Sequence, residues 1–391
     1  MKLALVVQRY GAEVAGGSEM HCREVAERLS AGHQVTVLTT CARDYITWRN
    51  EFPAGESREA GVRILRFRAR QRNAARFWHA SQLAFSRQAR PEEEVAWFRE
   101  NGPYAPELIQ HLETEGASYD CVLFWTYRYY PSFAGLPLVA DRAILLPTAE
   151  EDPAVRIRCL RGFFRRPAGF FFLTEEEAQL IRTLAADPLA NSEVIGSGLD
   201  PAPEGSDPQQ LAAAGIEPGA DFMLYLGRVD KNKGCETLFE HYLRYVEDTG
   251  STSLLIIAGK DAMPIPDHPQ IKKLGFVADE TRMALLSAAR FLVMPSPFES
   301  LSLVLLEAWN HSRPALVNGH CNVLRGQVRR ADGGLYYDNY QQFREGADLL
   351  FERRETADQL GAQGLAYVEQ HYRWPIVMAK IEHGLKRWPA R

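Results

Sequence analysis

Apolar residues at the start of the chain alternate between short continuous runs and helical spacing. Residues 3–7 form a continuous apolar run, as expected of a strand that is buried on both faces. A glycine-containing loop follows, and between Cys22 and Leu29 the apolar residues recur at positions i, i+3, i+4 and i+7 of an amphipathic helix. Another apolar run, 35–39, comes after Gly32. This strand–loop–helix–strand order predicts the start of a parallel, doubly wound sheet.

Further apolar runs continue the alternation. Residues 121–125, 143–146, 169–173 and 193–195 are predicted strands, each bounded by polar, glycine or proline segments. Residues 201–220 are instead rich in proline, glycine, alanine and glutamine. This change of composition predicts a domain boundary near residue 200.

Beyond this boundary the same alternation starts again. The predicted strands are 222–226, 253–258, 291–294 and 314–317. The predicted helices are 235–246, 279–289, which Asp279 would cap, and 301–310. We therefore expect two similar α/β domains in tandem.

Composition narrows the class of protein. The chain has 391 residues, of which 46% are hydrophobic and 24% charged, as in folded soluble proteins. A net charge of −5 argues against a nucleic-acid-binding protein. No apolar run is long enough to predict a transmembrane helix, and Gln8 and Arg9 end the first run too early for a signal peptide. The six cysteines are scattered without a C-x-x-C pair, which fits a reducing cytoplasm and predicts neither a zinc site nor disulfides.

Residues 62–91 differ from the rest of this acidic protein. They contain eight arginines and no Asp or Glu, with aromatic residues between them. The arginines are 63, 66, 68, 70, 72, 76, 87 and 90, and the aromatic residues include Phe67, Phe77, Trp78 and Phe85. One interpretation is a cationic, aromatic surface on the acceptor side that contacts an anionic membrane peripherally. The other is a solvated face over a partly buried helix that has Trp78 and Phe85 in the core.

Three motifs carry candidate chemistry. Gly16 and Gly17 lie between the first strand and the first helix, where backbone amides and the helix dipole favour an anion. The G-x-G-x-x-G spacing is absent and no acidic residue ends the second strand, so a nicotinamide or flavin site is rejected. The second motif, residues 226–234, places Arg228 and Lys233 in the loop after a strand, where open α/β sheets bind ligands. Two cations there can neutralise a diphosphate.

The third motif, residues 295–307, combines a loop and a helix start. Glu299 lies in the loop and Glu307 lies two turns into the predicted helix. The amides of Leu301 to Leu303 lie between them at the helix N-terminus, which is suited to phosphate. One carboxylate could then hold sugar hydroxyls and the other a ribose.

Together these motifs resemble the retaining glycosyltransferases of the GT-B fold, family 4, over nearly the whole chain. In that family a glycine pair follows the first strand, a G-R-x-x-x-x-K-G loop opens the second domain, and two glutamates with seven residues between them close the site. The resemblance implies two Rossmann-like domains that face across a cleft. Residues 1–200 would form the acceptor-side domain, 201–371 the nucleotide-sugar domain, and 372–391 a helix that returns to the first domain.

The resemblance also implies a role for each matched residue. Arg228 and Lys233 would stabilise the departing nucleoside diphosphate, and Glu299, the third catalytic residue, would hold hydroxyls of the donor sugar. Glu307 would bind the ribose. The other residues expected to bind the donor are Gly16, Gly17, Glu150, Gly227, Ser300, Leu301, Ser302 and Leu303. No metal or other cofactor is expected, since the two cations would serve the diphosphate and the sequence contains no D-x-D motif.

One position departs from the family pattern. Relatives often have a histidine in a string such as P-T-A-H-D-E-P, whereas here the string of residues 147–153 has Glu150 at that place. The histidine normally contacts the donor sugar. A carboxylate can accept a hydrogen bond from a sugar hydroxyl, but it adds negative charge near the anomeric centre. Donor choice could change, or activity could be lost.

The resemblance implies a cytoplasmic enzyme, at most peripherally attached to the membrane, that transfers a hexose with retention. The donor would be a nucleoside-diphosphate sugar, and the acceptor a hydroxyl of a saccharide or lipid-linked molecule in cell-surface polysaccharide or glycoconjugate synthesis. Two alternatives stay open: a non-catalytic nucleotide-sugar-binding protein, because of Glu150, and a nucleotide-sugar epimerase or glycogen-synthase-like polymerase on the same fold. The sequence does not distinguish nucleobase, sugar or acceptor.

Overall fold

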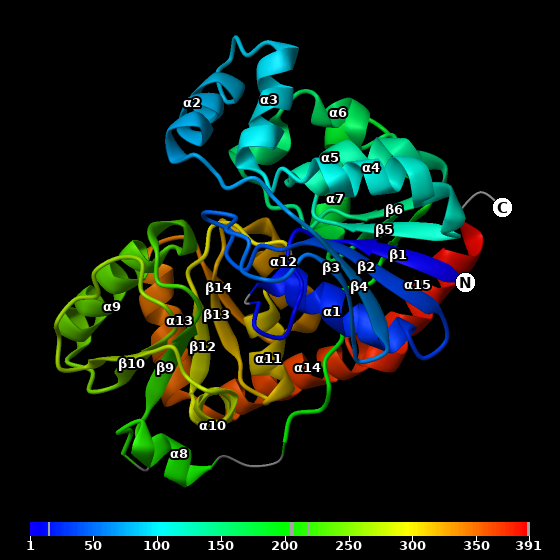
Figure 1. Ribbon diagram of the computed structural model, residues 1–391. Coiled ribbons are helices and arrows are strands. Elements are labelled where there is room, and N and C mark those ends of the chain that lie inside the picture. Colours follow the sequence, from blue (N-terminus) through cyan, green and yellow to red (C-terminus); the bar gives the residue numbers. More distant parts are fainter. Residues whose placement is uncertain (15, 204–206, 218, 389–391) are drawn as a thin grey trace. The chain divides into compact units, whose positions relative to one another are not determined.

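A computed structural model describes residues 1–14, 16–203, 207–217 and 219–388 (Figure 1). The chain divides into two compact units. The first comprises Met1–Ser197 together with Val377–Arg391, and the second comprises Gly198–Ile376. Each unit has its own sheet and its own hydrophobic core.

The first unit contains, in its described part, an eight-stranded sheet of order β3-β4-β2-β1-β5-β6-β7-β8. All neighbouring strands are parallel except β3 and β4, which are antiparallel. At the centre, Leu5 of β1 pairs with Val37 of β2 and Leu123 of β5. The strands are β1 (Lys2–Val6), β2 (Gln34–Thr40), β3 (Gly55–Glu59), β4 (Val62–Phe67), β5 (Cys121–Trp125), β6 (Ala143–Leu146), β7 (Gly169–Phe172) and β8 (Ser192–Val194).

Helices cover both faces of this sheet, because the central strands are apolar on both sides. The helices of this unit are α1 (Gly17–Leu29), α2 (Ala74–Ala84), α3 (Pro91–Asn101), α4 (Pro106–Glu115), α5 (Tyr130–Gly135), α6 (Leu160–Phe163), α7 (Glu175–Ala185) and α15 (Trp374–Arg387). Short 3₁₀ turns are η1 (Gly116–Ser118), η2 (Leu136–Arg142) and η3 (Pro153–Arg156). Figure 1 shows α2 and α3 side by side at the periphery of this unit.

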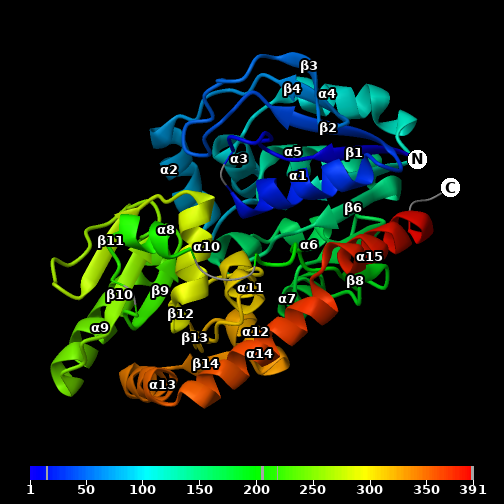
Figure 2. The same cartoon turned by 90° about the horizontal axis from the view of Figure 1, so that it is seen from below.

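Helix α15 is anchored on the first unit, where Figure 2 shows it beside β8. Lys380 Nζ donates to the carbonyl oxygen of Val194 at 3.0 Å, and the His33 ring and the Glu382 carboxylate are 2.8 Å apart. The Trp388 ring packs on Phe171, with 5.1 Å between ring centroids. A Cβ atom at Gly169 would lie 2.4 Å from the Trp388 ring, so glycine is required there to admit the indole.

The second unit contains, among the described residues, a parallel six-stranded sheet of order β11-β10-β9-β12-β13-β14. Its strands are β9 (Phe222–Leu226), β10 (Leu254–Ala258), β11 (Ile271–Gly275), β12 (Phe291–Met294), β13 (Ala315–Asn318) and β14 (Gly334–Tyr337). Its helices are α8 (Pro208–Ala213), α9 (Cys235–Thr249), α10 (Asp279–Ala288), α11 (Leu303–Asn310), α12 (Asn322–Ala331), α13 (Tyr340–Glu352) and α14 (Arg354–His371), with a 3₁₀ turn η4 (Lys231–Lys233).

The two-domain α/β fold with parallel sheets is confirmed, but local details differ from the expectations. Residues 62–67 form β4, in which Val62, Ile64 and Arg66 are buried and the residues that alternate with them are half-buried. Helix α11 begins at Leu303 rather than at 301, because Ser302 has a left-handed backbone (φ 65°) that a helix cannot include. Ala278 occupies the N-cap of α10, so Asp279 is the first helical residue and not the cap. The structure contains no helix, within the described ranges, that is long and apolar enough to cross a membrane.

Candidate active site

Glycines bring the strand ends of the second unit into contact. Gly227 ends β9 with φ +146°, and a Cβ at Gly259 would lie 1.8 Å from the Gly227 carbonyl oxygen. Gly259 N donates to the carbonyl oxygen of Gly275 at 2.7 Å, so the ends of β9, β10 and β11 lie in a row. A Cβ at Gly234 would lie 2.2 Å from the carbonyl oxygen of Pro295. The loop after β9 therefore lies directly against the loop after β12.

This contact places the predicted cation and carboxylate together. Lys233 Nζ and Glu299 Oε1 are 2.8 Å apart, and the Glu299 side chain is only 11% exposed. Arg228 forms an ion pair with Asp230, whose other oxygen accepts a hydrogen bond from Lys233 N at 2.9 Å. Asp230 was not predicted as a site residue. Its position between Arg228 and Lys233 in the sequence could have indicated it, because a carboxylate there can bind the Arg228 side chain and accept a hydrogen bond from the loop backbone.

Tyr225 supports the same loop from the strand before it. Its hydroxyl donates to the Arg228 carbonyl oxygen at 2.7 Å. Burial raises the pKa of Tyr225, with the neighbouring thiol Cys235 adding to the effect, so the phenol stays a neutral donor. The backbone of Arg228 is thus fixed while its side chain stays 41% exposed.

The start of α11 is held by three side chains from neighbouring elements. Gln327 Nε2, fully buried on α12, donates to the Leu301 carbonyl oxygen. Ser296 Oγ donates to the carbonyl oxygen of Phe298 at 2.9 Å, and Asn318 Nδ2 donates to that of Pro295 at 3.0 Å. Because the helix begins at Leu303, its first amides without intrahelical acceptors belong to Leu303 and the residues after it. Ser300 and Leu301 precede them in the loop, so the anion-binding end lies two residues later than predicted.

Glu307 projects from α11 toward α10. Its carboxylate forms an ion pair with Arg282, and the Glu307 side chain is 17% exposed. Arg282 also contacts Asp279 at 3.3 Å. Although burial acts against it, the negative charges of Glu307 and Asp279 raise the pKa of Arg282. Arg282 was not predicted as a site residue, since an arginine on a surface helix gives no local signal.

One turn further along α11 lies a neutral histidine. The His311 Nδ1 atom and the Ser287 hydroxyl are 2.8 Å apart. Burial, with Arg282 and Arg313 as further causes, lowers the pKa of His311 to about 4. The imidazole is therefore uncharged at neutral pH, and Arg282 is the cation that faces Glu307.

In the first unit, Gly16 is required by a buried ion pair. Gly16 has φ +155°, and a Cβ there would lie 2.3 Å from the Glu19 carboxylate. Glu19 is 5% exposed and accepts hydrogen bonds from Arg9 Nε at 2.9 Å and Gln8 Nε2 at 2.8 Å. Gly17 is the first residue of α1. Gly16 is thus explained locally by Glu19, and neither Glu19 nor Arg9 was predicted as a site residue.

The loop that carries Glu150 is held by a buried carboxylate. Ala149 N and Leu173 N donate to the two oxygens of Glu177, both at 2.6 Å. Burial raises the pKa of Glu177 to about 8, although hydrogen bonds from the backbone of Leu173, Ala149 and Thr174 act in the opposite direction and lower it. Glu150 itself is half-buried beside Tyr127 and Arg128, on whose pKa values its charge acts.

The arginines of residues 62–91 do not form one cationic face. Arg63 pairs with Glu56 on the adjacent strand, and Arg66 is 6% exposed and donates to the Tyr10 carbonyl oxygen. Arg72 donates to Asn101 and stacks over Phe77. The expectation of a continuous cationic face from 63 to 76 is therefore wrong for these three.

The expectation that Trp78 is a core residue is also wrong. Trp78 on α2 is 65% exposed, and Phe85 after the helix is 44% exposed. Arg68, Arg76 and Arg87 are exposed, and no ion pair to them is seen among the residues that the structure describes. Exposed aromatic and cationic residues thus gather on α2 and its flanks.

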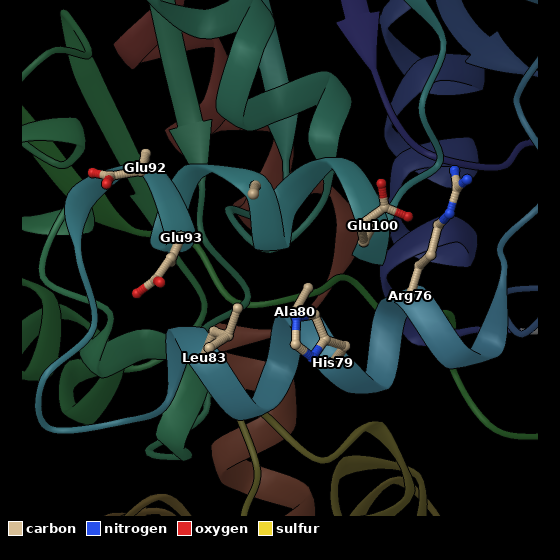
Figure 3. Close-up of a pocket in the computed structure, with 8 residues that line it drawn as sticks. Arg76, His79, Ala80, Leu83, Glu92, Glu93 and Glu100 are labelled. Carbon is tan, nitrogen blue, oxygen red and sulfur yellow. The ribbon is translucent and has the colours of Figure 1, made fainter.

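A pocket of about 450 Å³ lies between α2 and α3 (Figure 3). It is lined by Arg76, His79, Ala80, Leu83, Glu92, Glu93, Ala96 and Glu100. All three of its carboxylates are already paired, Glu92 and Glu93 with Arg90 and Glu100 with Arg70. None of the predicted donor-binding residues lines it. Within the described part of the chain, no group of three or more metal-ligating side chains could hold a metal ion.

Comparisons with known proteins agree with the geometry. Residues 220–351 match the family described as Glycosyl transferases group 1. No curated protein matches the chain in sequence. Among solved structures, sucrose-phosphate synthase from Thermosynechococcus elongatus is 15% identical, with 99% of this chain and 98% of that chain covered and a TM-score of 0.72.

Two further structures have bound ligands. Anabaena Alr3699/HepE in complex with UDP and glucose is 13% identical, with 99% of both chains covered and a TM-score of 0.69. A trehalose-6-phosphate structure from E. coli with bound UDP-2-fluoro glucose is 11% identical, with 100% of both chains covered and a TM-score of 0.73. The chain thus has the two-domain α/β fold of GT-B glycosyltransferases, and its residues 220–351 match the family of group 1 glycosyl transferases.

Proposed function

We propose that the chain is a retaining glycosyltransferase that transfers a hexose from a UDP-sugar to a hydroxyl acceptor. The observation that carries the proposal is the cluster at the strand ends of the second unit. Lys233 and Glu299 are 2.8 Å apart, Arg228 lies in the same loop, and the first amides of α11 follow Glu299 closely in the chain. Cations and helix amides suit a diphosphate, and carboxylates suit sugar hydroxyls. The ligands of the two similar structures, UDP with glucose and UDP-2-fluoro glucose, support uracil as the base of the donor.

The proposed chemistry is a front-side displacement. As the bond from the anomeric carbon to the phosphate oxygen breaks, negative charge develops on the diphosphate. Arg228, Lys233 and the α11 amides would stabilise this charge, and preorganised stabilisation of this kind accounts for most of the rate enhancement in many enzymes. The leaving phosphate oxygen would take the proton of the acceptor hydroxyl as the new glycosidic bond forms, so the configuration is retained.

The Lys233–Glu299 pair is compatible with both proposed roles. An ammonium group has three donors, so Lys233 can keep its bond to Glu299 and still donate to a phosphate oxygen. A carboxylate has several acceptor sites, so Glu299 can accept from Lys233 and from sugar hydroxyls. The pair would thereby hold the sugar beside the bond that breaks. Two further points remain predictions. One is that the donor contacts Gly16, Gly17, Gly227 and Glu150, and the other is that the reaction needs no metal.

The second candidate function is that of a non-catalytic nucleotide-sugar-binding protein, and Glu150 is the observation that favours it. A half-buried carboxylate replaces the histidine of relatives, and it would oppose further negative charge nearby. An epimerase or a glycogen-synthase-like polymerase on the same fold stays a further alternative. Release of UDP that needs an acceptor would select the transferase, whereas tight binding of UDP-sugar without turnover would select the binding protein.

The test has two stages. Thermal shift with UDP, GDP and ADP, followed by their sugars, identifies the nucleotide, since a ligand that binds only the folded state raises the melting temperature. Acceptor screening with the selected donor then follows UDP release, and NMR of the product gives the anomeric configuration. An inverted product would contradict the mechanism, and failure of all three nucleotides to bind would overturn the function.

We also propose that the protein is cytoplasmic and makes a peripheral membrane contact through α2 and its flanks, beside a lipid-linked acceptor used in cell-surface polysaccharide or glycoconjugate synthesis. Trp78 and Phe85 are exposed, and Arg68, Arg76 and Arg87 add positive charge without an acidic residue between 62 and 91. Aromatic rings suit the headgroup layer, and each arginine near an anionic surface contributes about 1 kcal/mol.

A further inference from the structure

The ion pair between Arg282 and Glu307 joins two helices of the second unit. Arg282 Nη1 donates to Glu307 Oε1, and its Nη2 atom lies 3.3 Å from Asp279. The exposed fractions of the side chains are 32% for Arg282, 17% for Glu307 and 76% for Asp279. Arg282 and Glu307 are therefore partly shielded from water, whereas Asp279 is a surface group.

Arg282 stands on a rigid base. Helix α10 buries Ala284, Leu285 and Leu286 against the unit, so the guanidinium reaches Glu307 from a fixed backbone. A guanidinium is planar and always charged, which fixes the direction of the carboxylate that it holds. Because the guanidinium engages Oε1, the Glu307 carboxylate is turned in a defined way while it keeps further acceptor sites.

A glutamate that binds a ribose diol needs this kind of support. Its side chain is flexible, and fixing it costs conformational entropy unless another group has already done so. Its negative charge also opposes a diphosphate bound nearby, and an adjacent cation offsets that repulsion. Arg282 meets both needs without touching the nucleotide.

We propose that Arg282 is a positioning residue that fixes Glu307 for the ribose of the nucleoside diphosphate. The inference rests on the proposed function, and it takes the ribose role of Glu307 from what the family resemblance implies. It adds that recognition of the 2′-hydroxyl depends on a residue of α10 outside the motifs that carry the family resemblance. Arg282 then governs how well the protein distinguishes a ribonucleotide from its 2′-deoxy analogue.

The experiment compares UDP with 2′-deoxy-UDP by calorimetry on the full chain. The variants are Arg282→Gln, Arg282→Lys, Glu307→Gln and the double variant of the first and third. Asp279→Asn is the matched control, because it removes the other carboxylate partner of Arg282 and leaves Glu307 in place. Melting temperatures report whether each variant folds.

For Arg282→Gln we expect UDP to bind about tenfold more weakly, with little change for 2′-deoxy-UDP, so that the preference for UDP largely disappears. Arg282→Lys, which keeps the charge but not the planar fork, should fall between wild type and Arg282→Gln. Asp279→Asn should bind as wild type does. The double variant should bind UDP within about twofold of Glu307→Gln, because residues that act through one another are not additive.

Two results would overturn parts of this account separately. If the wild type binds UDP and Arg282→Gln weakens both ligands by the same factor, Arg282 only supplies charge or stability and the positioning role is wrong. A double variant that loses the sum of both single effects would have the same meaning. If the wild type binds none of UDP, GDP and ADP, the proposed function fails, and the role of Arg282 fails with it.

Discussion

The ammonium nitrogen of Lys233 lies 2.8 Å from the carboxylate of Glu299, although the two residues are 66 positions apart in the chain. Gly234 allows this approach, because any side chain there would collide with Pro295. Each charge is partly withdrawn from water and neutralised by the other. A substitution of either residue therefore also takes the opposite charge away from its partner, which stays partly buried, and this has a cost of its own.

The first prediction concerns the two cations of the loop after β9. Lys233→Ala and Arg228→Ala should each lower kcat about a hundredfold or more, since a lost stabiliser of the leaving group costs roughly 3 kcal/mol in the transition state. Lys231→Ala is the control: Lys231 lies in the same loop but is 71% exposed and pairs with Glu236. Near-wild-type turnover of both single variants, with folding intact, would contradict the assignment.

The second prediction separates the two glutamates. Glu307→Ala should weaken binding of UDP and UDP-sugar alike, because both contain the ribose. Glu299→Ala should leave UDP binding within a few-fold and mainly reduce discrimination among donor sugars. Calorimetry with UDP and then with the donors measures the difference. Equal losses on both ligands in both variants would be inconsistent with these roles.

The third prediction concerns divalent metals. If Arg228 and Lys233 meet the charge of the diphosphate, treatment with EDTA should leave the transfer rate essentially unchanged. The rate is measured before chelation, after chelation, and after addition of Mg²⁺ or Mn²⁺. Loss of activity that the added ion restores would show that a metal takes part.

The fourth prediction is a fall of stability between pH 6.5 and 8. The pKa of Glu177 is about 8 in the folded protein and near 4.5 in an unfolded chain, so in this range the folded state holds a proton that the unfolded state has released. The free energy of unfolding then decreases by at most about 1.4 kcal/mol for each pH unit. Below pH 6.5 the effect of Glu177 continues, but two histidines outweigh it: burial lowers the pKa of His21 and of His311 to about 4, so the unfolded state binds up to two extra protons there.

Urea unfolding of wild type and Glu177→Gln at pH 6.5, 7.2 and 8 tests this prediction. The amide is uncharged like the protonated carboxyl group, but its NH2 cannot accept one of the two backbone hydrogen bonds. The variant should therefore be less stable at every pH and should lose most of the decline. Parallel pH dependence of the two proteins would mean that Glu177 is ionised throughout, as its two backbone hydrogen bonds of 2.6 Å would favour.

The fifth prediction concerns α2. The protein should co-sediment with liposomes that contain anionic lipid, and changing Arg68, Arg76 and Arg87 to Gln should weaken binding up to about a hundredfold, at roughly 1 kcal/mol for each charge. Trp78→Ala should weaken binding to the same liposomes by removing the ring from the headgroup layer. The control changes three arginines of the second unit, Arg244, Arg344 and Arg354, to Gln. Equal, negligible sedimentation with neutral and anionic liposomes would refute the contact.

Sequence patterns were sufficient where the chemistry is local. Arg228 and Lys233 share one loop, and Glu299 and Glu307 share one loop and helix, so their order along the chain already indicates a common edge of the sheet. Arg282 could not be found in this way, since its contact with Glu307 depends on how α10 packs beside α11. The start of α11 was misplaced because the left-handed backbone of Ser302 is a tertiary result and no propensity of serine predicts it.

The arginine segment shows the same limit. Val62 and Ile64 alternate with Arg63 and Leu65 in the pattern of a strand, but the high density of charge suggested a continuous surface instead. Which arginines point inward depends on acceptors elsewhere, such as the Tyr10 carbonyl oxygen for Arg66. The sequence therefore located the exposed cluster only approximately.

Because α15 returns to the first unit, the two units are not completed in the order in which they are synthesised. Domains generally fold in the order in which the ribosome releases them. Here the second unit is one continuous segment, Gly198–Ile376, whereas the first unit still lacks the residues from Val377 onward. Until they emerge, the space beside Gly169 that Trp388 occupies stays unfilled and His33 lacks Glu382. A chain that ends at residue 376 thus holds every residue of its second unit but leaves part of the first unit without its last helix, so the first unit to be made is the last to be completed.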